Sequence, residues 1–118
     1  MKSYNDSNPL FAIQKAYHEP TRSLLFHSTE IESDRLQEAL DLIGDYNEFN
    51  SKKVGKVLLD VFGDRCKYIV GREYSVVVYV IPMMTNFHFW VNDMAEVKEK
   101  GVIDEVAVVN GRLRMWWD

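Results

Sequence analysis

Apolar residues recur along this chain with two different spacings, and the change of spacing separates helices from strands. Between residues 28 and 49, several candidate N-cap residues precede apolar positions at helical spacing, which predicts an amphipathic helix. A second helix is expected to begin at a Ser51 cap and to end at Gly63. The apolar face of the first helix consists of Leu36, Ala39, Leu40, Ile43 and Tyr46 or Asn47, and that of the second of Val54, Val57, Leu58, Val61 and Phe62.

Apolar runs of strand length predict two hairpins in the second half of the chain. CKYIV (residues 66–70) and YSVVVYVI (residues 74–81) flank GRE, a short glycine-containing connection typical of a β-hairpin, and Pro82 is expected to end the second strand. Further along, Asn110 and Gly111 separate two β-rich runs and form a dipeptide that favours the two-residue type I′ turn. These hairpins supply most of the predicted sheet.

The beginning of the chain fits two patterns. Leu10, Ile13 and Tyr17 suit a helix, whereas Pro20 and the apolar run after it suit a strand pair. A strand is expected over residues 23–28, and the part before it stays open. The first nine residues are polar and are expected to form a loose leader.

The order of the predicted elements indicates the fold class. A short helix, with Asn92 or Asp93 as its cap and Gly101 at its end, lies between the two hairpins. The chain therefore reads as strand, two helices, two strands, helix and two strands. This order predicts a single α+β domain over residues 1–118, with an antiparallel sheet, helices mainly on one face, and a split βαβ-like order with a C-terminal β-hairpin.

Composition narrows the class of protein without naming a function. The 118 residues, 47% hydrophobic and 27% charged, suit one globular domain. The net charge of −4 argues against a protein that neutralises phosphates, and the lone Cys66 excludes an internal disulfide framework. No stretch approaches the roughly 18 apolar residues that span a bilayer. We expect a cytoplasmic protein.

The Asn110–Gly111 turn fixes the pairing of the two strands beside it. Counting outward from the turn pairs Val109 with Arg112, Val108 with Leu113, Ala107 with Arg114, Val106 with Met115 and Glu105 with Trp116. Because neighbouring side chains in a strand point to opposite faces, Trp117 shares the core face with Leu113, whereas Trp116 lies on a face that carries charge. We expect Trp117 to be buried and Trp116 to be at least partly accessible.

Trp116 has two interpretations. In the first, the indole is a partly exposed side chain that makes a cation–π contact with Arg114, two positions away on the same face. In the second, it belongs to an interaction patch, because the strand at residues 74–81 is apolar on both sides while the helices cover only one of them. This patch would comprise Val77, Tyr79, Ile81, Val109 and Trp116, with Arg114 at its rim.

The sequence gives little support for catalysis. His18, His27 and His88 lie outside the usual catalytic spacings, and a histidine beside apolar residues is more often a packed imidazole than a general base. Cys66 opens a segment with the pattern of a buried strand, so its thiol is expected to be structural. We expect no enzyme activity, no cofactor and no metal site.

Residues 72–79, REYSVVVY, resemble the central-strand consensus of the RNA-recognition-motif family. The positions that match are Arg72, Tyr74, Val77 and Tyr79. Glu73 stands where the family has glycine, and Val76 replaces a stacking aromatic residue. The resemblance implies RNA binding through the same sheet face.

Two functions follow from these patterns. The favoured one is a small non-catalytic cytoplasmic binding protein, a regulator, inhibitor or immunity-type protein, whose aromatic sheet face engages a protein partner. A second copy of the chain is the simplest partner, with Glu105 and Arg114 pairing across a twofold axis. The alternative is a binder of single-stranded nucleic acid or nucleotides that uses the same face for stacking. The expected contact residues are Trp116, Tyr79, Val109, Arg114 and Val77.

Overall fold

The computed structural model describes residues 10–18, 25–84, 89 and 91–118, which form four α-helices and a five-stranded antiparallel sheet. The elements in chain order are α1 (Phe11–His18), β1 (Leu25–His27), α2 (Ser33–Ile43), α3 (Ser51–Val61), the 3₁₀ turn η1 (Gly63–Arg65), β2 (Cys66–Glu73), β3 (Ser75–Pro82), α4 (Val91–Lys100), β4 (Glu105–Val109) and β5 (Arg112–Trp116). This arrangement confirms the predicted α+β class and the C-terminal hairpin.

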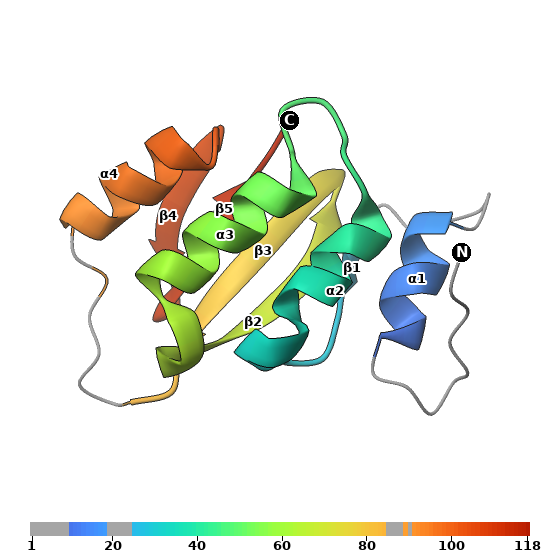
Figure 1. Ribbon diagram of the computed structural model, residues 1–118, viewed down its shortest axis with the longest axis horizontal. Coiled ribbons are helices and arrows are strands. Elements are labelled where there is room, and N and C mark those ends of the chain that lie inside the picture. Colours follow the sequence, from blue (N-terminus) through green and yellow to red (C-terminus); the bar gives the residue numbers. More distant parts are fainter. Residues whose placement is uncertain (1–9, 19–24, 85–88, 90) are drawn as a thin grey trace.

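The helices lie mainly on one face of the sheet. The strand order is β1-β2-β3-β5-β4, so β3 and β4 run parallel with β5 between them, and α4 connects them as in a split βαβ unit. Helices α2, α3 and α4 cover the front of the sheet in Figure 1, and α1 lies beside the β1 edge. The opposite face carries no helix among the described residues, and we call it the open face.

The two central helices form as predicted but differ at their ends. Helix α2 ends at Ile43, and Gly44 follows it with a positive φ (76°) that helical residues do not adopt, so the predicted continuation to Tyr46 or Asn47 is wrong. The N-cap of α3 is Asn50, not Ser51, since the Asn50 side chain accepts a hydrogen bond from the Lys53 amide at 2.9 Å.

The start of α4 also differs from the prediction. The helix begins at Val91, which places the predicted caps Asn92 and Asp93 inside its first turn, and it ends at Lys100, just before Gly101. No helix in the described part of the chain combines the length and the apolar character needed to cross a bilayer.

Strand β2 is three residues longer than predicted, which moves the turn between β2 and β3 along the chain. Strand β2 continues through the GRE segment to Glu73, and the chain reverses at Tyr74, whose φ is 67°. Gly71 is needed for close approach and not for a turn, because a Cβ atom there would lie 2.3 Å from the Phe26 carbonyl oxygen of β1.

Helix α1 resolves the alternative left open at the start of the chain. Leu10, Ile13 and Tyr17 are all buried along this side of the molecule, as a helix requires. The Tyr17 hydroxyl donates a hydrogen bond to the Gly71 carbonyl, and the Arg72 guanidinium lies 4.9 Å from the Tyr17 ring. These contacts anchor α1 to β2.

Several predictions fall on residues that are only partly described. The strand expected over residues 23–28 is confirmed at β1, while residues 23 and 24 lie outside the described residues. The predicted leader (residues 1–9) and His88 also lie outside them, as does the side chain of His18.

The C-terminal hairpin has the predicted register at all five positions. Asn110 and Gly111 both have positive φ angles, 52° and 76°, as a type I′ turn requires. Trp117 is fully buried: its ring packs edge-on against Phe49 at 5.1 Å between centroids, and its indole N–H donates to the Gly101 carbonyl at 3.1 Å. Trp116 is partly exposed, as expected.

Replacing Trp117 with alanine should lower the free energy of unfolding by about 3–5 kcal/mol, because the change removes a large buried ring and leaves a cavity. Urea denaturation followed by circular dichroism measures this loss. Val109→Ala, an exposed truncation in the same hairpin, serves as the control and should cost less than about 0.5 kcal/mol. Equal losses in the two variants would contradict the burial of Trp117.

Candidate functional site

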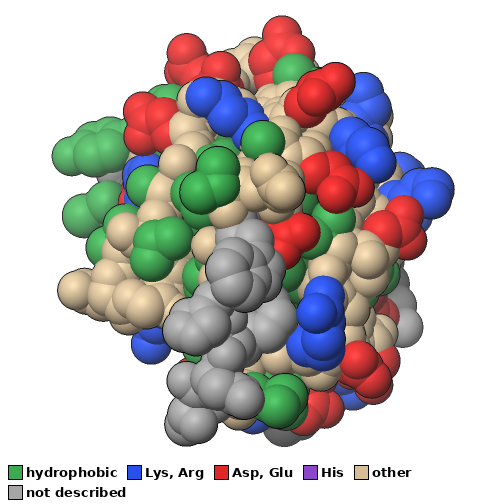
Figure 2. Space-filling view, turned by 90° about the vertical axis from the view of Figure 1, so that its left-hand side faces the viewer, with side chains coloured by type: hydrophobic (Ala, Val, Ile, Leu, Met, Phe, Trp, Pro, Cys, Tyr) green, Lys and Arg blue, Asp and Glu red, His purple; other side chains and the backbone are tan. Residues whose placement is uncertain are grey.

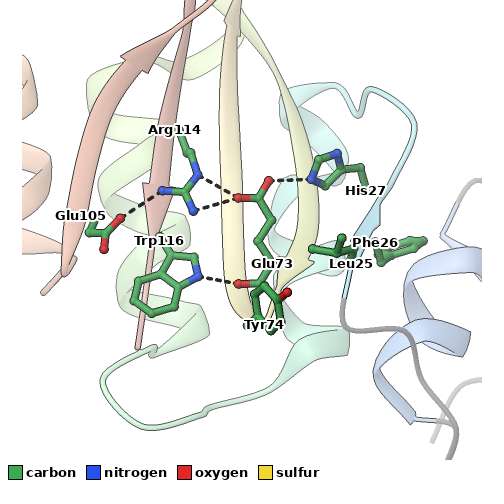
Figure 3. A pocket seen from close by; sticks show the side chains of 8 residues that line it. All are labelled: Leu25, Phe26, His27, Glu73, Tyr74, Glu105, Arg114 and Trp116. Carbon is green, nitrogen blue, oxygen red and sulfur yellow. Dashed lines mark hydrogen bonds and ion pairs between the residues drawn. The ribbon is translucent and has the colours of Figure 1, made fainter.

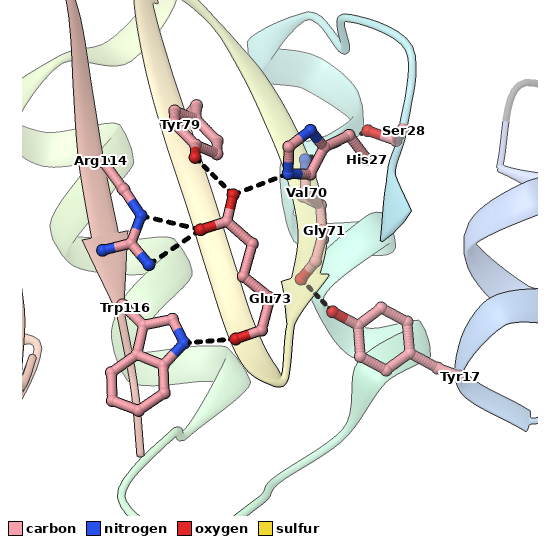
Figure 4. Close-up of polar contacts among 9 residues, drawn as sticks. All are labelled: Tyr17, His27, Ser28, Val70, Gly71, Glu73, Tyr79, Arg114 and Trp116. Atoms are coloured by element: carbon pink, nitrogen blue, oxygen red, sulfur yellow. Dashed lines mark hydrogen bonds and ion pairs between the residues drawn. The ribbon is translucent and has the colours of Figure 1, made fainter. Parts of the chain in front are cut away.

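The carboxylate of Glu73 organises the polar contacts of the open face. Its Oε1 atom lies 2.8 Å from both Nε and Nη2 of Arg114. Its Oε2 atom accepts hydrogen bonds from His27 Nε2 at 2.7 Å and from the Tyr79 hydroxyl (Figure 4). Arg114 Nη1 continues the chain of contacts to Glu105 Oε1 at 3.2 Å. We call these five residues the polar row.

The polar row crosses the whole sheet. Each of the five strands contributes one member, and the members follow the strand order from β1 to β4. In that order they are His27, Glu73, Tyr79, Arg114 and Glu105. Side-chain contacts thus connect strands that are not hydrogen-bonded neighbours in the sheet.

Gly71 makes room for the first member of the row. A Cβ atom at Gly71 would lie 2.9 Å from the Cδ2 atom of His27, so the imidazole occupies space that any other residue would fill. The His27 ring also meets the Tyr79 ring edge-on, with 5.4 Å between centroids. The missing side chain at Gly71 therefore lets the His27 ring of the edge strand β1 reach Glu73 and Tyr79.

Hydrogen bonding keeps Glu73 ionised. Burial by itself would raise the pKa of this carboxyl, but the hydrogen bonds from Tyr79, Arg114 and His27 and the charge of Arg114 outweigh it, and the pKa lies below the ordinary 4.5. Burial, and then contact with Glu73, raise the pKa of Tyr79. Since an ionised carboxylate only accepts hydrogen bonds, His27 Nε2 carries a proton toward Glu73.

A hollow of about 590 Å³ opens on this face along the polar row, and four of the five members of the row line it (Figure 3). Leu25 and Tyr74 stand at its rim with 61% and 69% of their surfaces exposed. The Trp116 indole forms a third apolar wall, and its N–H donates to the Glu73 carbonyl at 2.8 Å. We call this the Trp116 hollow; it is lined by Leu25, Phe26, His27, Glu73, Tyr74, Glu105, Arg114 and Trp116.

The predicted contact residues divide between two hollows of the open face. Trp116 and Arg114 line the Trp116 hollow, whereas Tyr79 and Val109 line a second hollow of about 420 Å³ that also includes His27. Val77 lies on the predicted face but is fully buried, so it has no exposed surface to offer a partner. Its partners in the neighbouring strands are Gly71, under the His27 ring, and Trp116, which flank it on both sides.

Two predicted contacts of Arg114 have different partners in the structure. Glu105 was expected to meet Arg114 across a twofold axis, but the two side chains pair within one chain. The indole of Trp116, expected beside the Arg114 guanidinium, makes its polar contact with the backbone of Glu73. An intrachain ion pair thus engages the two charges that were expected to meet between copies.

His27, Glu73 and Tyr74 belong to the site but were absent from the predicted one. His27 is not the packed imidazole that its neighbours suggested; its side chain is about half exposed (49%). Glu73 was assigned to a turn. If the strand is extended beyond residue 70, the alternation of its side chains between the two faces places Glu73 on the open face, together with Tyr79 and Arg114.

The segment that resembles the RNA-recognition motif does not form a single strand. The chain turns at Tyr74, so Arg72 belongs to β2 and Tyr79 to β3. Arg72 is buried on the helix-covered face, opposite the face that the resemblance requires. The resemblance is therefore limited to the amino-acid sequence and does not extend to the structure.

Other chemistry is sparse in the described part of the chain. No group of three or more His, Cys, Asp or Glu side chains there has the placement to hold a metal ion. Cys66 is buried, and its burial raises the pKa of the thiol to about 11. A thiol with this pKa is almost entirely protonated at neutral pH and is a poor nucleophile.

Replacing Glu73 with glutamine should make the free energy of unfolding less dependent on pH in the acidic range. A carboxyl whose pKa is lower in the folded chain stabilises the fold above its unfolded pKa, and this contribution is lost as the pH falls toward the folded pKa. The wild type should therefore exceed Glu73→Gln in unfolding free energy most at neutral pH, and the difference should shrink below pH 4.5. Urea denaturation over a pH series measures it.

The exposed Glu48 supplies the matched control, because it lies outside the polar row. Glu48→Gln should follow the wild-type profile throughout. A constant difference between wild type and Glu73→Gln at every pH would show that the contacts of Glu73 do not depend on its charge.

Native Cys66 should resist alkylation at neutral pH and react rapidly once the chain is unfolded in urea. Cys66→Ala should leave binding unchanged and lower the free energy of unfolding by about 1 kcal/mol, because it removes a buried sulfur atom. Mass spectrometry after timed iodoacetamide treatment follows the labelling. Rapid labelling of the folded chain would contradict the structural role of this thiol.

Comparison with known proteins leaves the site to be interpreted from its own geometry. No protein-family model, no curated protein and no solved structure matches this chain significantly.

Proposed function

We propose that this chain is a small non-catalytic binding protein of the cytoplasm, a regulator or inhibitor, that engages a partner protein through the Trp116 hollow. The observation that carries the proposal is the apolar rim of the exposed Leu25 and Tyr74 and the partly exposed Trp116 around a hollow with a polar floor. Aromatic side chains at the edge of a concave surface are typical of binding hot spots.

Tyr74 supports the proposal through its backbone. A left-handed conformation costs a residue with a Cβ atom about 1–2 kcal/mol, and glycine would avoid most of that cost. The Tyr74 side chain is 69% exposed, so burial in the fold does not explain why a bulky residue occupies the turn. Strain that folding does not require is characteristic of functional positions. A partner that covers the ring would account for it.

The polar row supports binding over catalysis. Both Glu73 oxygens and the guanidinium of Arg114 are engaged by other members of the row. These contacts hold the floor of the hollow in one arrangement before a partner arrives, which lowers the entropic cost of association. The proposed role of the row is to orient Trp116 and the rim, not to activate a reacting group.

Nucleic acid binding through this face has weaker support. Arg114 directs its guanidinium at Glu73 and Glu105 rather than into solvent, so it is poorly placed to contact phosphate. The hollow also carries two carboxylates, which repel a polyanion. A protein partner that inserts an apolar side chain between Tyr74 and Trp116 fits the charges of the hollow better.

Tyr74→Gly separates binding from stability. Glycine relieves the left-handed strain, so the free energy of unfolding should stay unchanged or rise by about 1 kcal/mol, while the rim loses its most exposed aromatic ring. Affinity capture from the native host's lysate, quantified by mass spectrometry and nucleic acid recovery, should show the specific protein reduced at least about tenfold, the loss of roughly 1.4 kcal/mol expected at a hot spot.

Tyr46→Ala is the matched control, because Tyr46 is also exposed but lies in the turn between α2 and α3. This variant should capture as much partner as the wild type. Equal capture by wild type and Tyr74→Gly would contradict the proposed surface. Recovery of nucleic acid that falls steeply with added salt would favour the alternative function.

A further inference from the structure

Within the described ranges, no strand pairs with the outer edge of β4. It is last in the strand order, and four of its five residues are exposed. Proteins usually protect such an edge with lysine, proline or a bulge, but β4 has the sequence EVAVV and pairs with β5 in an unbroken register. Figure 2 shows this side of the molecule, where hydrophobic side chains gather on one half and charged side chains on the half toward the helices.

We propose that β4 is the site at which a second copy of this chain binds. The two β4 strands would run antiparallel about a twofold axis at Ala107, so that the sheets of both copies join. With this register all five residues overlap: Val106 faces Val108, Glu105 faces Val109, and Ala107 faces its own equivalent. The proposal concerns a different surface from the Trp116 hollow and does not depend on the partner proposed there.

The backbone of β4 is in phase with this pairing. In a two-residue hairpin the residues beside the turn form a hydrogen-bonded pair, so Val109, Ala107 and Glu105 direct their amides and carbonyls toward β5. Val106 and Val108 therefore direct theirs outward. A twofold axis at Ala107 sets Val106 of one copy opposite Val108 of the other, which is the combination that forms hydrogen-bonded pairs.

The side chains are also complementary about that axis. Ala107 would meet its equivalent at a non-hydrogen-bonded position, where opposing Cα atoms are only about 4.5 Å apart and a small side chain fits. Glu105 would lie opposite the short Val109 of the second copy, and beyond Val109 stands Arg112, its partner in the hairpin. Arg112 is exposed, and Glu105 uses only Oε1 in its ion pair with Arg114. Because of the twofold symmetry, Glu105 of each copy would thus lie near Arg112 of the other, which gives two ion pairs.

The other edge of the sheet is a poorer site for pairing. Strand β1 has three residues and lies beside α1, as Figure 1 shows. Antiparallel pairing through so short a strand would form few hydrogen bonds. The β4 edge is longer, and its apolar residues Val108 and Val109 keep 51% and 39% of their surfaces exposed.

Lysine substitutions at two neighbouring open-face positions test the register. Ala107→Lys places two ammonium groups opposite each other at the axis and should weaken self-association at least about tenfold. Val109→Lys places its ammonium opposite Glu105 of the second copy and should preserve or strengthen the dimer. Sedimentation equilibrium of the wild type and both variants from micromolar to near-millimolar concentration measures the effect, with circular dichroism to confirm folding.

Cross-linking supplies a second test that does not rely on charge. Ala107→Cys brings two thiols to the axis at a Cα separation within the range of a disulfide, so mild oxidation should give a covalent dimer. In Val109→Cys the thiols of the two copies lie several residues apart along the strands and should not cross-link. The native Cys66 is buried and does not compete.

A wild type that stays monomeric over the whole concentration range would overturn the proposal. So would a dimer that Val109→Lys disrupts while Ala107→Lys leaves it intact. Trp116→Glu distinguishes the two proposals, because it should abolish capture of the partner protein without changing the mass in sedimentation. A dimer lost in Trp116→Glu but kept in Ala107→Lys would place the contact on the open face and not at the β4 edge.

Discussion

The ionised carboxylate of Glu73 is the constraint on which the open face depends. A partly buried charge is costly unless donors surround it, and Glu73 recruits those donors from β1, β3 and β5. Each donor is thereby fixed in place: the imidazole lies over Gly71, the phenol points along the sheet, and the guanidinium turns away from solvent. A single acid at the end of one strand thus holds three other side chains in place beside the apolar rim.

The two faces of the sheet are stabilised by different interactions. Under the helices, large side chains such as Trp117 and Tyr68 fill the core and hold the layers together. On the open face no second layer covers the sheet among the described residues, and the polar row replaces a core with charge and hydrogen bonds. Because these contacts are directional, the open face combines an ordered floor with exposed apolar walls. That combination suits recognition better than it suits tight packing.

Sequence patterns predicted the parts of the fold that local chemistry determines. Asn110 and Gly111 both tolerate positive φ, so these two residues predicted the hairpin and its register. The register in turn predicted that Trp117 is buried and that Trp116 lies on the opposite face. The other hairpin was misplaced, because its glycine serves close packing and its turn uses a tyrosine. The contacts of Glu73 could not be predicted, since they join residues 41 and 46 positions apart in the chain. Long-range polar pairs leave no periodic signal.

The positive φ of Tyr74 also bears on the evolution of the protein. A tyrosine codon is one base change from an asparagine or aspartate codon, and both of those residues tolerate positive φ better than tyrosine does. Mutation therefore offers an easy route to a more relaxed turn. If a partner covers Tyr74 as proposed, a lineage that lost this partner would have no selection against such a change. Folding alone favours glycine, asparagine or aspartate at this turn. An aromatic residue retained there among diverged relatives would therefore indicate continued selection for binding.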